Sequence, residues 1–174
     1  MNNARRLLLI AALIALPRLG VAGDFLVADL QGRLAIGDVA AVNAYLSANW
    51  ETRMAALGRM VRRCDTDALH LSVRLLDTTN LEALQGHIFS LELAMGRCPE
   101  KLLPIVPASQ VKSFCAVDAF AEMHPSTNLA AEIDRRVLVI RKASSLAASP
   151  NGASCLDAYA ASRSLLNHRP MPLR

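Results

Sequence analysis

The sequence predicts an all-α domain, either a compact irregular helical bundle or a short α-solenoid of about eight helices, stapled by disulfides. Leu and Ala dominate the chain, whereas Thr and aromatic residues are scarce, and this composition favours helix over strand. Apolar residues also recur at a helical period, and no segment alternates as a half-buried strand does. Both observations point to one fold class.

The first 23 residues have the pattern of a cleavable secretory signal peptide. Arg5 and Arg6 precede an apolar run from Leu7 to Leu16, and Val21-Ala22-Gly23 supplies small residues for a signal peptidase. This run is too short for a stable bilayer anchor, and no later segment approaches the ~18 consecutive apolar residues of a membrane span. We therefore expect a single mature domain, residues 24–174, that is exported to the periplasm without a stable membrane anchor.

Capping residues and apolar stripes place the helices in order along the mature chain. The expected stripes are Val39, Val42 and Leu46 behind an N-cap at Asp38; Met54, Leu57 and Val61; Leu81, Leu84, Ile88, Leu91 and Met95 behind a capping box over Thr79–Glu82; Leu129, Ile133, Val137 and Ile140 behind Asn128; and Leu156, Tyr159 and Leu166 in a last helix from Ser154.

Prolines mark the main breaks between these helices. Pro99, Pro104 and Pro107 make residues 99–108 an irregular connection, and the Ser149–Gly152 stretch is a further break. Trp50 falls at a helix junction, where we expect it to pack between two helices, with a binding anchor as the alternative.

A weak internal repeat is visible at a shift of 34 residues. It superposes Leu57 on Leu91, Val61 on Met95, and Arg63-Cys64 on Arg97-Cys98. This period suits the helix–turn–helix unit of an α-solenoid, but the tetratricopeptide consensus is absent. A repeat array and an irregular bundle therefore both remain open.

The four cysteines predict two disulfides rather than a metal site. Zinc and iron–sulfur sites need clustered ligands, whereas Cys64, Cys98, Cys115 and Cys155 are widely spaced and all follow the predicted signal peptide. Four cysteines permit three connectivities. The favoured one joins Cys64 to Cys98, at equivalent points of the suspected repeat, and therefore Cys115 to Cys155.

The charge balance argues against nucleic acid and anionic membrane as partners. Removing Arg5, Arg6 and Arg18 with the signal peptide leaves 16 basic residues against 15 acidic ones, a net charge of about +1. One basic stretch remains, formed by Arg135, Arg136, Arg141 and Lys142. We expect it on a solvated helix face, with contact to an acidic partner as the alternative.

Catalytic and cofactor signatures are not readable. The histidines lack partners at metal-binding spacing, and no nucleophile elbow or glycine-rich phosphate loop occurs. The carboxylate pairs Glu92/Glu100 and Asp118/Glu122 are better explained as surface acids than as a glycosidase pair. The prediction is a protein without enzymatic activity, metal or cofactor.

The C-terminal piece Ser154-Cys155-Leu156-Asp157-Ala158-Tyr159, followed by Leu165-Leu166 and Arg169, resembles the closing segment of periplasmic immunity proteins that neutralise type VI secretion amidase effectors. The resemblance covers roughly 15 mature residues. It implies a small exported helical protein with disulfides that plugs the active-site cleft of a toxin.

Together these observations predict an exported protein-binding domain that acts as an immunity or inhibitor protein on another exported protein, such as a toxin or effector. An envelope or secretion-apparatus accessory protein and a helical enzyme with an unrecognised site are the alternatives, and a homodimer stays open. Two connections suit insertion into a partner, and their candidate binding residues are Leu103, Pro104, Ile105, Val106, Pro107, Pro150, Asn151 and Gly152.

Overall fold

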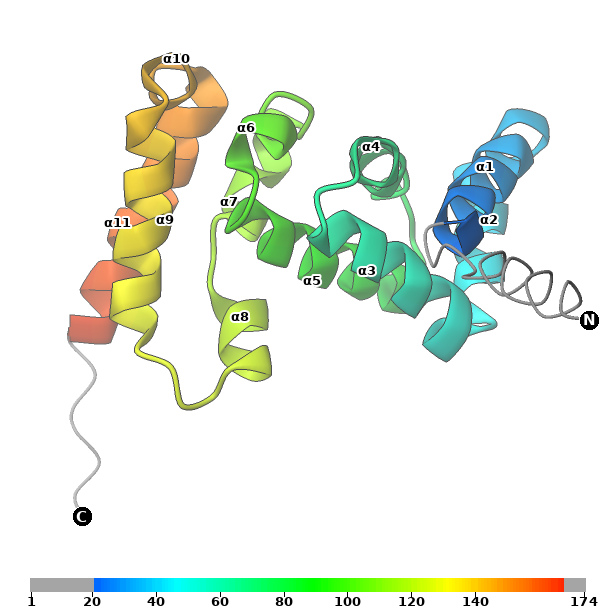
Figure 1. Ribbon diagram of the computed structural model, residues 1–174, viewed down its shortest axis with the longest axis horizontal. Coiled ribbons are helices and arrows are strands. Elements are labelled where there is room, and N and C mark those ends of the chain that lie inside the picture. Colours follow the sequence, from blue (N-terminus) through cyan, green and yellow to red (C-terminus); the bar gives the residue numbers. More distant parts are fainter. Residues whose placement is uncertain (1–20, 168–174) are drawn as a thin grey trace, which may run out of the picture.

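The computed structural model describes residues 21–167 and shows a succession of helices without a strand in that range (Figure 1). Helices that follow one another in the chain lie next to one another, from α1 and α2 at one end to α9, α10 and α11 at the other. The predicted all-α, disulfide-stapled fold is confirmed. Residues 1–20 of the predicted signal peptide lie outside the described residues, and Val21–Gly23 begin α1.

The helices differ widely in length. They are α1 (Val21–Ile36), α2 (Val39–Ser47), the π-helix η1 (Trp50–Met54), α3 (Ala55–Arg62), α4 (Thr66–Arg74), α5 (Leu81–Met95), α6 (Pro99–Leu102), the 3₁₀ turn η2 (Ala108–Gln110), α7 (Val111–Phe114), α8 (Asp118–Met123), α9 (Leu129–Lys142), α10 (Ser144–Ala147) and α11 (Pro150–Asn167).

Two predicted N-caps are confirmed by their hydrogen bonds. The Asp38 side chain accepts from the amide of Ala41 at 2.7 Å, and Asn128 accepts from Ala131 at 3.2 Å. In each case a side-chain oxygen satisfies a backbone N–H that the first turn of a helix leaves unpaired.

The capping box predicted for α5 is shifted by one residue. Asn80, not Thr79, is the N-cap, and its side chain accepts from Ala83 at 3.1 Å. The side-chain Nδ2 of Asn80 also donates to Ser47 Oγ at 3.2 Å, so the cap residue holds the start of α5 against the end of α2. This contact between helices is invisible to a purely local motif.

The last helix begins at Pro150, four residues before the predicted Ser154. Proline suits the first helical position because the N–H that it lacks would have no partner there. Ser149 caps the helix, since its Oγ accepts a hydrogen bond from the backbone amide of Gly152 at 3.0 Å. The Ser149–Gly152 break is therefore the start of a helix.

The core is built around α5, which packs against α3 on one side and against α7 and α8 on the other. Leu57 and Val61 of α3 and Leu91 and Met95 of α5 are all buried. These residues form two of the pairs that the 34-residue shift superposes. The correspondence weakens afterwards, because nine residues form α4 whereas only four form α6 before Pro104 and Pro107.

Both predicted disulfides are present. Cys64 is joined to Cys98 with 6.2 Å between their Cα atoms, and Cys115 to Cys155 with 5.2 Å. Cys64 lies just beyond α3 with a φ of 64°, and the amide of Asp65 donates to the carbonyl of Met60. This is a Schellman ending with a cysteine in the left-handed position that usually favours glycine. It turns the chain so that the ends of α3 and α5 come within disulfide reach.

Candidate functional site

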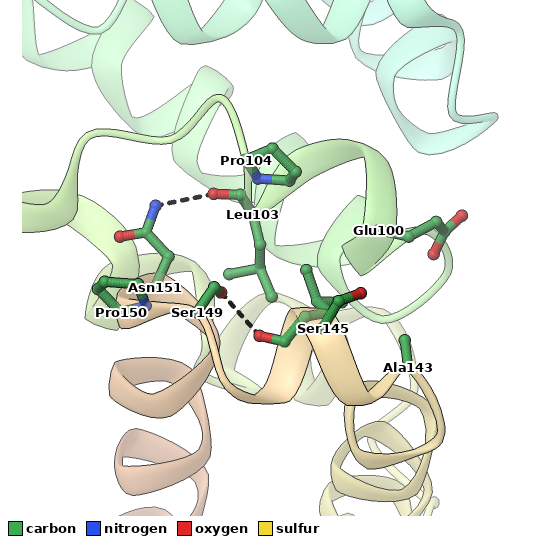
Figure 2. A pocket seen from close by; sticks show the side chains of 9 residues that line it. Glu100, Leu103, Pro104, Ala143, Ser145, Ser149, Pro150 and Asn151 are labelled. Atoms are coloured by element: carbon green, nitrogen blue, oxygen red, sulfur yellow. Dashed lines mark hydrogen bonds between the residues drawn. The ribbon is translucent and has the colours of Figure 1, made fainter.

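The two segments predicted to bind a partner meet at one end of the molecule. Leu103–Pro107 connects α6 to η2, and Pro150–Gly152 forms the first turn of α11. The side-chain amide of Asn151 donates to the carbonyl oxygens of Leu103 at 2.7 Å and Val106 at 2.9 Å. Figure 2 shows Asn151 pointing from α11 toward the Leu103 carbonyl. One side chain therefore holds the Leu103–Pro107 segment, which we call the proline turn, against the first turn of α11.

The eight predicted residues divide into a surface set and an anchoring set. Leu103, Val106 and Gly152 are buried, and Ile105 and Asn151 are half-buried. A side chain at position 152 would clash with the carbonyl of Leu146, so only glycine fits there. The exposed members are Pro104, Pro107 and Pro150, and we call these three the proline face.

A shallow cavity of about 520 Å³ opens beside the proline face, and it is drawn in Figure 2. It is lined by Glu100, Leu103, Pro104, Ala143, Ser145, Leu146, Ser149, Pro150 and Asn151. Helices α6, α9–α10 and α11 all reach it, so residues distant in sequence form one surface. This mixture of apolar walls and a few hydroxyl and carboxylate groups suits protein contact.

A larger groove of about 740 Å³, which we call the Trp50 groove, lies along α5. Trp50 is 37% exposed, and its ring lies over Gly86, where a Cβ would come within 2.6 Å of Trp50 Cη2. Trp50 therefore packs against α5, as expected, but its ring also lines an open groove. Its lining residues are Trp50, Met54, Ala55, Arg62, Glu82, Gln85, Gly86, Ile88, Phe89, Ser90, Glu92, Ser113, Asp118, Ala119 and Glu122.

A third cavity of about 260 Å³ shares Arg62 with the Trp50 groove, and we call it the Arg62 pocket. It lies where the ends of α3 and α5 face α8 and α9. Four arginines reach it against a single carboxylate, that of Glu132. Its lining residues are Arg62, Leu93, Gly96, Arg97, Phe120, Met123, His124, Glu132, Arg135 and Arg136.

The predicted solvated basic face is only partly correct. Arg136 is fully buried, and its Nε donates to Glu132 at 2.7 Å while its Nη1 donates to the Ala116 carbonyl at 2.9 Å. Arg135 is half-exposed and holds both oxygens of Glu132 at 2.7 Å. Burial alone would raise the pKa of Glu132, but hydrogen bonds from the two arginines lower it overall.

Glu92 belongs to the same buried network. Its carboxylate accepts from the amides of Ala119 at 2.8 Å and Phe120 at 3.1 Å, at the start of α8, and lies 3.9 Å from Arg136. Burial raises the pKa of Glu92, although these hydrogen bonds and Arg136 oppose the shift. Glu92 thus caps a helix that is far from it in sequence, and the expectation that it is a surface acid is wrong.

A Ser–His–Asn chain is hidden in the core between α2, α4 and α5. His87 Nδ1 lies 2.8 Å from Ser72 Oγ, and its Nε2 lies 3.0 Å from Asn43 Oδ1. Since Asn43 donates its amide to the Leu75 carbonyl, its oxygen accepts from His87 Nε2, and Nδ1 accepts from Ser72. All three residues are buried, and burial lowers the pKa of His87 to about 4. No substrate reaches this chain in the described structure.

The other histidines and the remaining predicted carboxylate pair do not belong to this buried Ser–His–Asn chain. His70 and His124 are exposed, and His124 contacts the Phe120 ring with 4.7 Å between centroids. His168 lies outside the described residues. Asp118 and Glu122 are exposed at the rim of the Trp50 groove. Within residues 21–167, no group of three or more His, Cys, Asp or Glu side chains is arranged to hold a metal ion.

Asn43, Ser72 and Asn151 were missed or understated by sequence reasoning because single polar residues on helices carry no local signal. Their hydrogen-bond partners lie between 15 and 48 positions away in the sequence. Among the described helices, none is both long and apolar enough to cross a membrane.

Comparison with known proteins returned no relatives: no protein-family model matches the chain, and no curated protein or solved structure is significantly similar to it.

Proposed function

We propose that this chain is an exported protein-binding domain, and that it acts as an immunity or inhibitor protein which occludes the active site of a periplasmic toxin. The observation that carries the proposal is the attachment of the proline turn to α11 through Asn151. The proline face would enter the partner's cleft, and the cavity beside it would receive a side chain of the partner.

Rigidity is what makes this surface suitable for inhibition. A loop that is already ordered loses little conformational entropy when it binds, so more of the contact energy remains as affinity. Three constraints act here: the two Asn151 hydrogen bonds, the fixed φ angles of Pro104 and Pro107, and the Cys115–Cys155 disulfide that ties α11 to α7.

An envelope or secretion-apparatus accessory protein is the second candidate. The observation that favours it is the open Trp50 groove, since exposed grooves with an aromatic residue commonly receive a segment of another protein. The buried Ser72–His87–Asn43 chain lends no support to the third alternative, a helical hydrolase.

The proposal is tested by co-export. Each exported product of the neighbouring genes is directed to the periplasm of a test cell, with and without this chain. We expect one of them to lyse the cell or stop its growth unless this chain is exported too. Deleting residues 2–23 should abolish protection while binding persists in a purified mixture. If every such product is harmless and none binds, the immunity proposal is wrong and the accessory role leads.

The surface is tested with matched proline substitutions. Pro104→Arg and Pro150→Arg place a bulky charge on the proline face, whereas Pro125→Arg makes the same change at an exposed turn between α8 and α9. We expect the first two to weaken partner binding about tenfold or more and the third to leave it unchanged. Equal behaviour of all three would place the interface elsewhere.

A further inference from the structure

Arg62 is a half-buried cation without a compensating anion. Its guanidinium has no hydrogen-bond or ion-pair partner among the described residues. Burial lowers the pKa of Arg62, and the neighbouring charges of Arg59 and Arg97 lower it further. Holding like charges together at a partly desolvated position costs free energy, and nothing within residues 21–167 offsets that cost.

The side chain of Arg62 is nevertheless held in place. It lies back along α3 over Gly58, where a Cβ would come within 3.1 Å of Arg62 Nη1. Arg97 lies beside it, because its Nη1 donates to the Arg62 carbonyl at 3.1 Å. Across the pocket, Arg135 is fixed by Glu132 and by the Gly96 carbonyl at 2.9 Å. The positive charges are therefore pre-organised rather than spread over mobile side chains.

Part of the wall of the Arg62 pocket is apolar. Leu93, Phe120 and Met123 line it together with the arginines, and Met123 is 51% exposed. A volume of about 260 Å³ accommodates one or two side chains. On its other side, Arg62 borders the Trp50 groove.

We propose that the Arg62 pocket binds a carboxylate of an Asp or Glu side chain on an acidic segment of a protein partner, with Arg62 and Arg97 as its ligands. Arginine binds carboxylates through two parallel N–H bonds, which suits a pocket with guanidinium groups on its walls. An apolar residue next to the acid would pack on Met123 and Phe120. This surface is distinct from the proline face and goes beyond the proposed function.

A protein carboxylate fits better than a phosphate on a nucleic acid or a lipid. Removal of the predicted signal peptide would leave a net charge of only about +1, which favours a single carboxylate over an extended polyanion as the ligand. The apolar part of the wall matches an aliphatic side chain beside the acid.

The experiment uses the exported chain and two peptides that differ only in charge, acetyl-Leu-Glu-Leu-Glu-Leu-amide and acetyl-Leu-Gln-Leu-Gln-Leu-amide. NMR of the arginine Nε–Hε groups follows the pocket, and the fluorescence of Trp50 follows the adjacent groove. We expect saturable shifts of the Arg62 and Arg97 signals with the Glu peptide at millimolar concentration. The Gln peptide should bind at least about tenfold more weakly.

Arg62→Gln separates a binding role from a structural one. It should abolish the response to the Glu peptide while the thermal midpoint of unfolding stays unchanged or rises, because the repulsion from Arg59 and Arg97 is relieved. Arg74→Gln, at an exposed arginine that ends α4, is the matched control and should bind as the wild type does.

Several results would overturn the inference. They are equal binding of the two peptides, no shift with either, unchanged binding by Arg62→Gln, and complete displacement of the Glu peptide by equimolar inorganic phosphate. A shift of the Arg62 signal on removal of residues 168–174 would show the chain's own C-terminal segment as occupant instead. These outcomes do not depend on whether any exported neighbour is toxic, so the two proposals fail separately.

Discussion

The carboxylate of Glu92, in the middle of α5, accepts a hydrogen bond from the backbone amide of Ala119 at the start of α8. A residue of one helix therefore caps another, although the two residues are 27 positions apart. The same carboxylate neighbours the buried guanidinium of Arg136, which reaches the Ala116 carbonyl and Tyr159. This network joins α5, α8, α9 and α11, and no local sequence motif indicates these contacts.

Replacing Glu92 with Gln should lower the free energy of unfolding by about 1–3 kcal/mol. The amides of Ala119 and Phe120 donate to different oxygens of Glu92, and a Gln side chain would turn an NH2 donor toward one of these amides. Arg136 would also lose a negative neighbour. Glu122→Gln, the same change at an exposed position of α8, is the control. Urea unfolding at neutral pH measures both variants, and equal midpoints would contradict the capping role of Glu92.

His87 should make the protein less stable in mild acid. Its folded pKa of about 4 lies below the ordinary value of 6.5, so the unfolded chain binds a proton first as the pH falls. The stabilisation is complete above pH 6.5 and is lost progressively toward pH 4, by about 3 kcal/mol in all.

Comparing the wild type with His87→Gln isolates this contribution, because other titrating groups are common to both chains. The stability difference between them, from urea unfolding at several pH values, should narrow as the pH falls from 7 to 4. A constant difference would mean that His87 is protonated in the folded state or accessible to water.

Gly86→Ala should disturb Trp50. The new Cβ would lie 2.6 Å from Trp50 Cη2 and 3.1 Å from Met54 Cγ, and such overpacking costs about 1–3 kcal/mol. Because Trp50 is the single tryptophan, its emission reports the displacement directly. Gly32→Ala is the opposite control, since a Cβ there meets nothing within 4 Å and should stabilise α1 by up to about 1 kcal/mol. An unchanged emission spectrum in Gly86→Ala would refute the predicted clash.

The left-handed backbone of Cys64 should favour glycine once its disulfide is removed. In a Cys98→Ala background, Cys64→Gly should be more stable than Cys64→Ala by about 1 kcal/mol, because alanine is strained at a φ of 64°. Chemical unfolding of the two double variants measures the difference. A more stable alanine variant would show that the Schellman turn exists only while the disulfide holds it.

Sequence signals predicted most of the long helices and favoured the correct disulfide pairing. A helix start depends on one side chain and the next few amides, so Asp38 and Asn128 could be recognised as caps from the sequence. The pairing of Cys64 with Cys98 followed from their equivalent positions after two similar helices. The predicted start of α11 was wrong because the Ser149–Gly152 sequence is typical of a turn. Pro150 is equally well suited to the first position of a helix, and the helix begins there.

By itself, the sequence determined an all-α domain, because helical periodicity and capping are properties of neighbouring residues, and it favoured one of the three possible disulfide pairings. The tertiary structure decided that Asn151 binds the Leu103–Pro107 turn, that Arg136 is buried and that Arg62 has no anionic partner among residues 21–167. These outcomes depend on hydrogen bonds and burial between residues far apart in the chain, such as Asn151 and Leu103, separated by 48 positions. Only the packing of the helices brings such pairs together, and that packing makes the proline face and the Arg62 pocket.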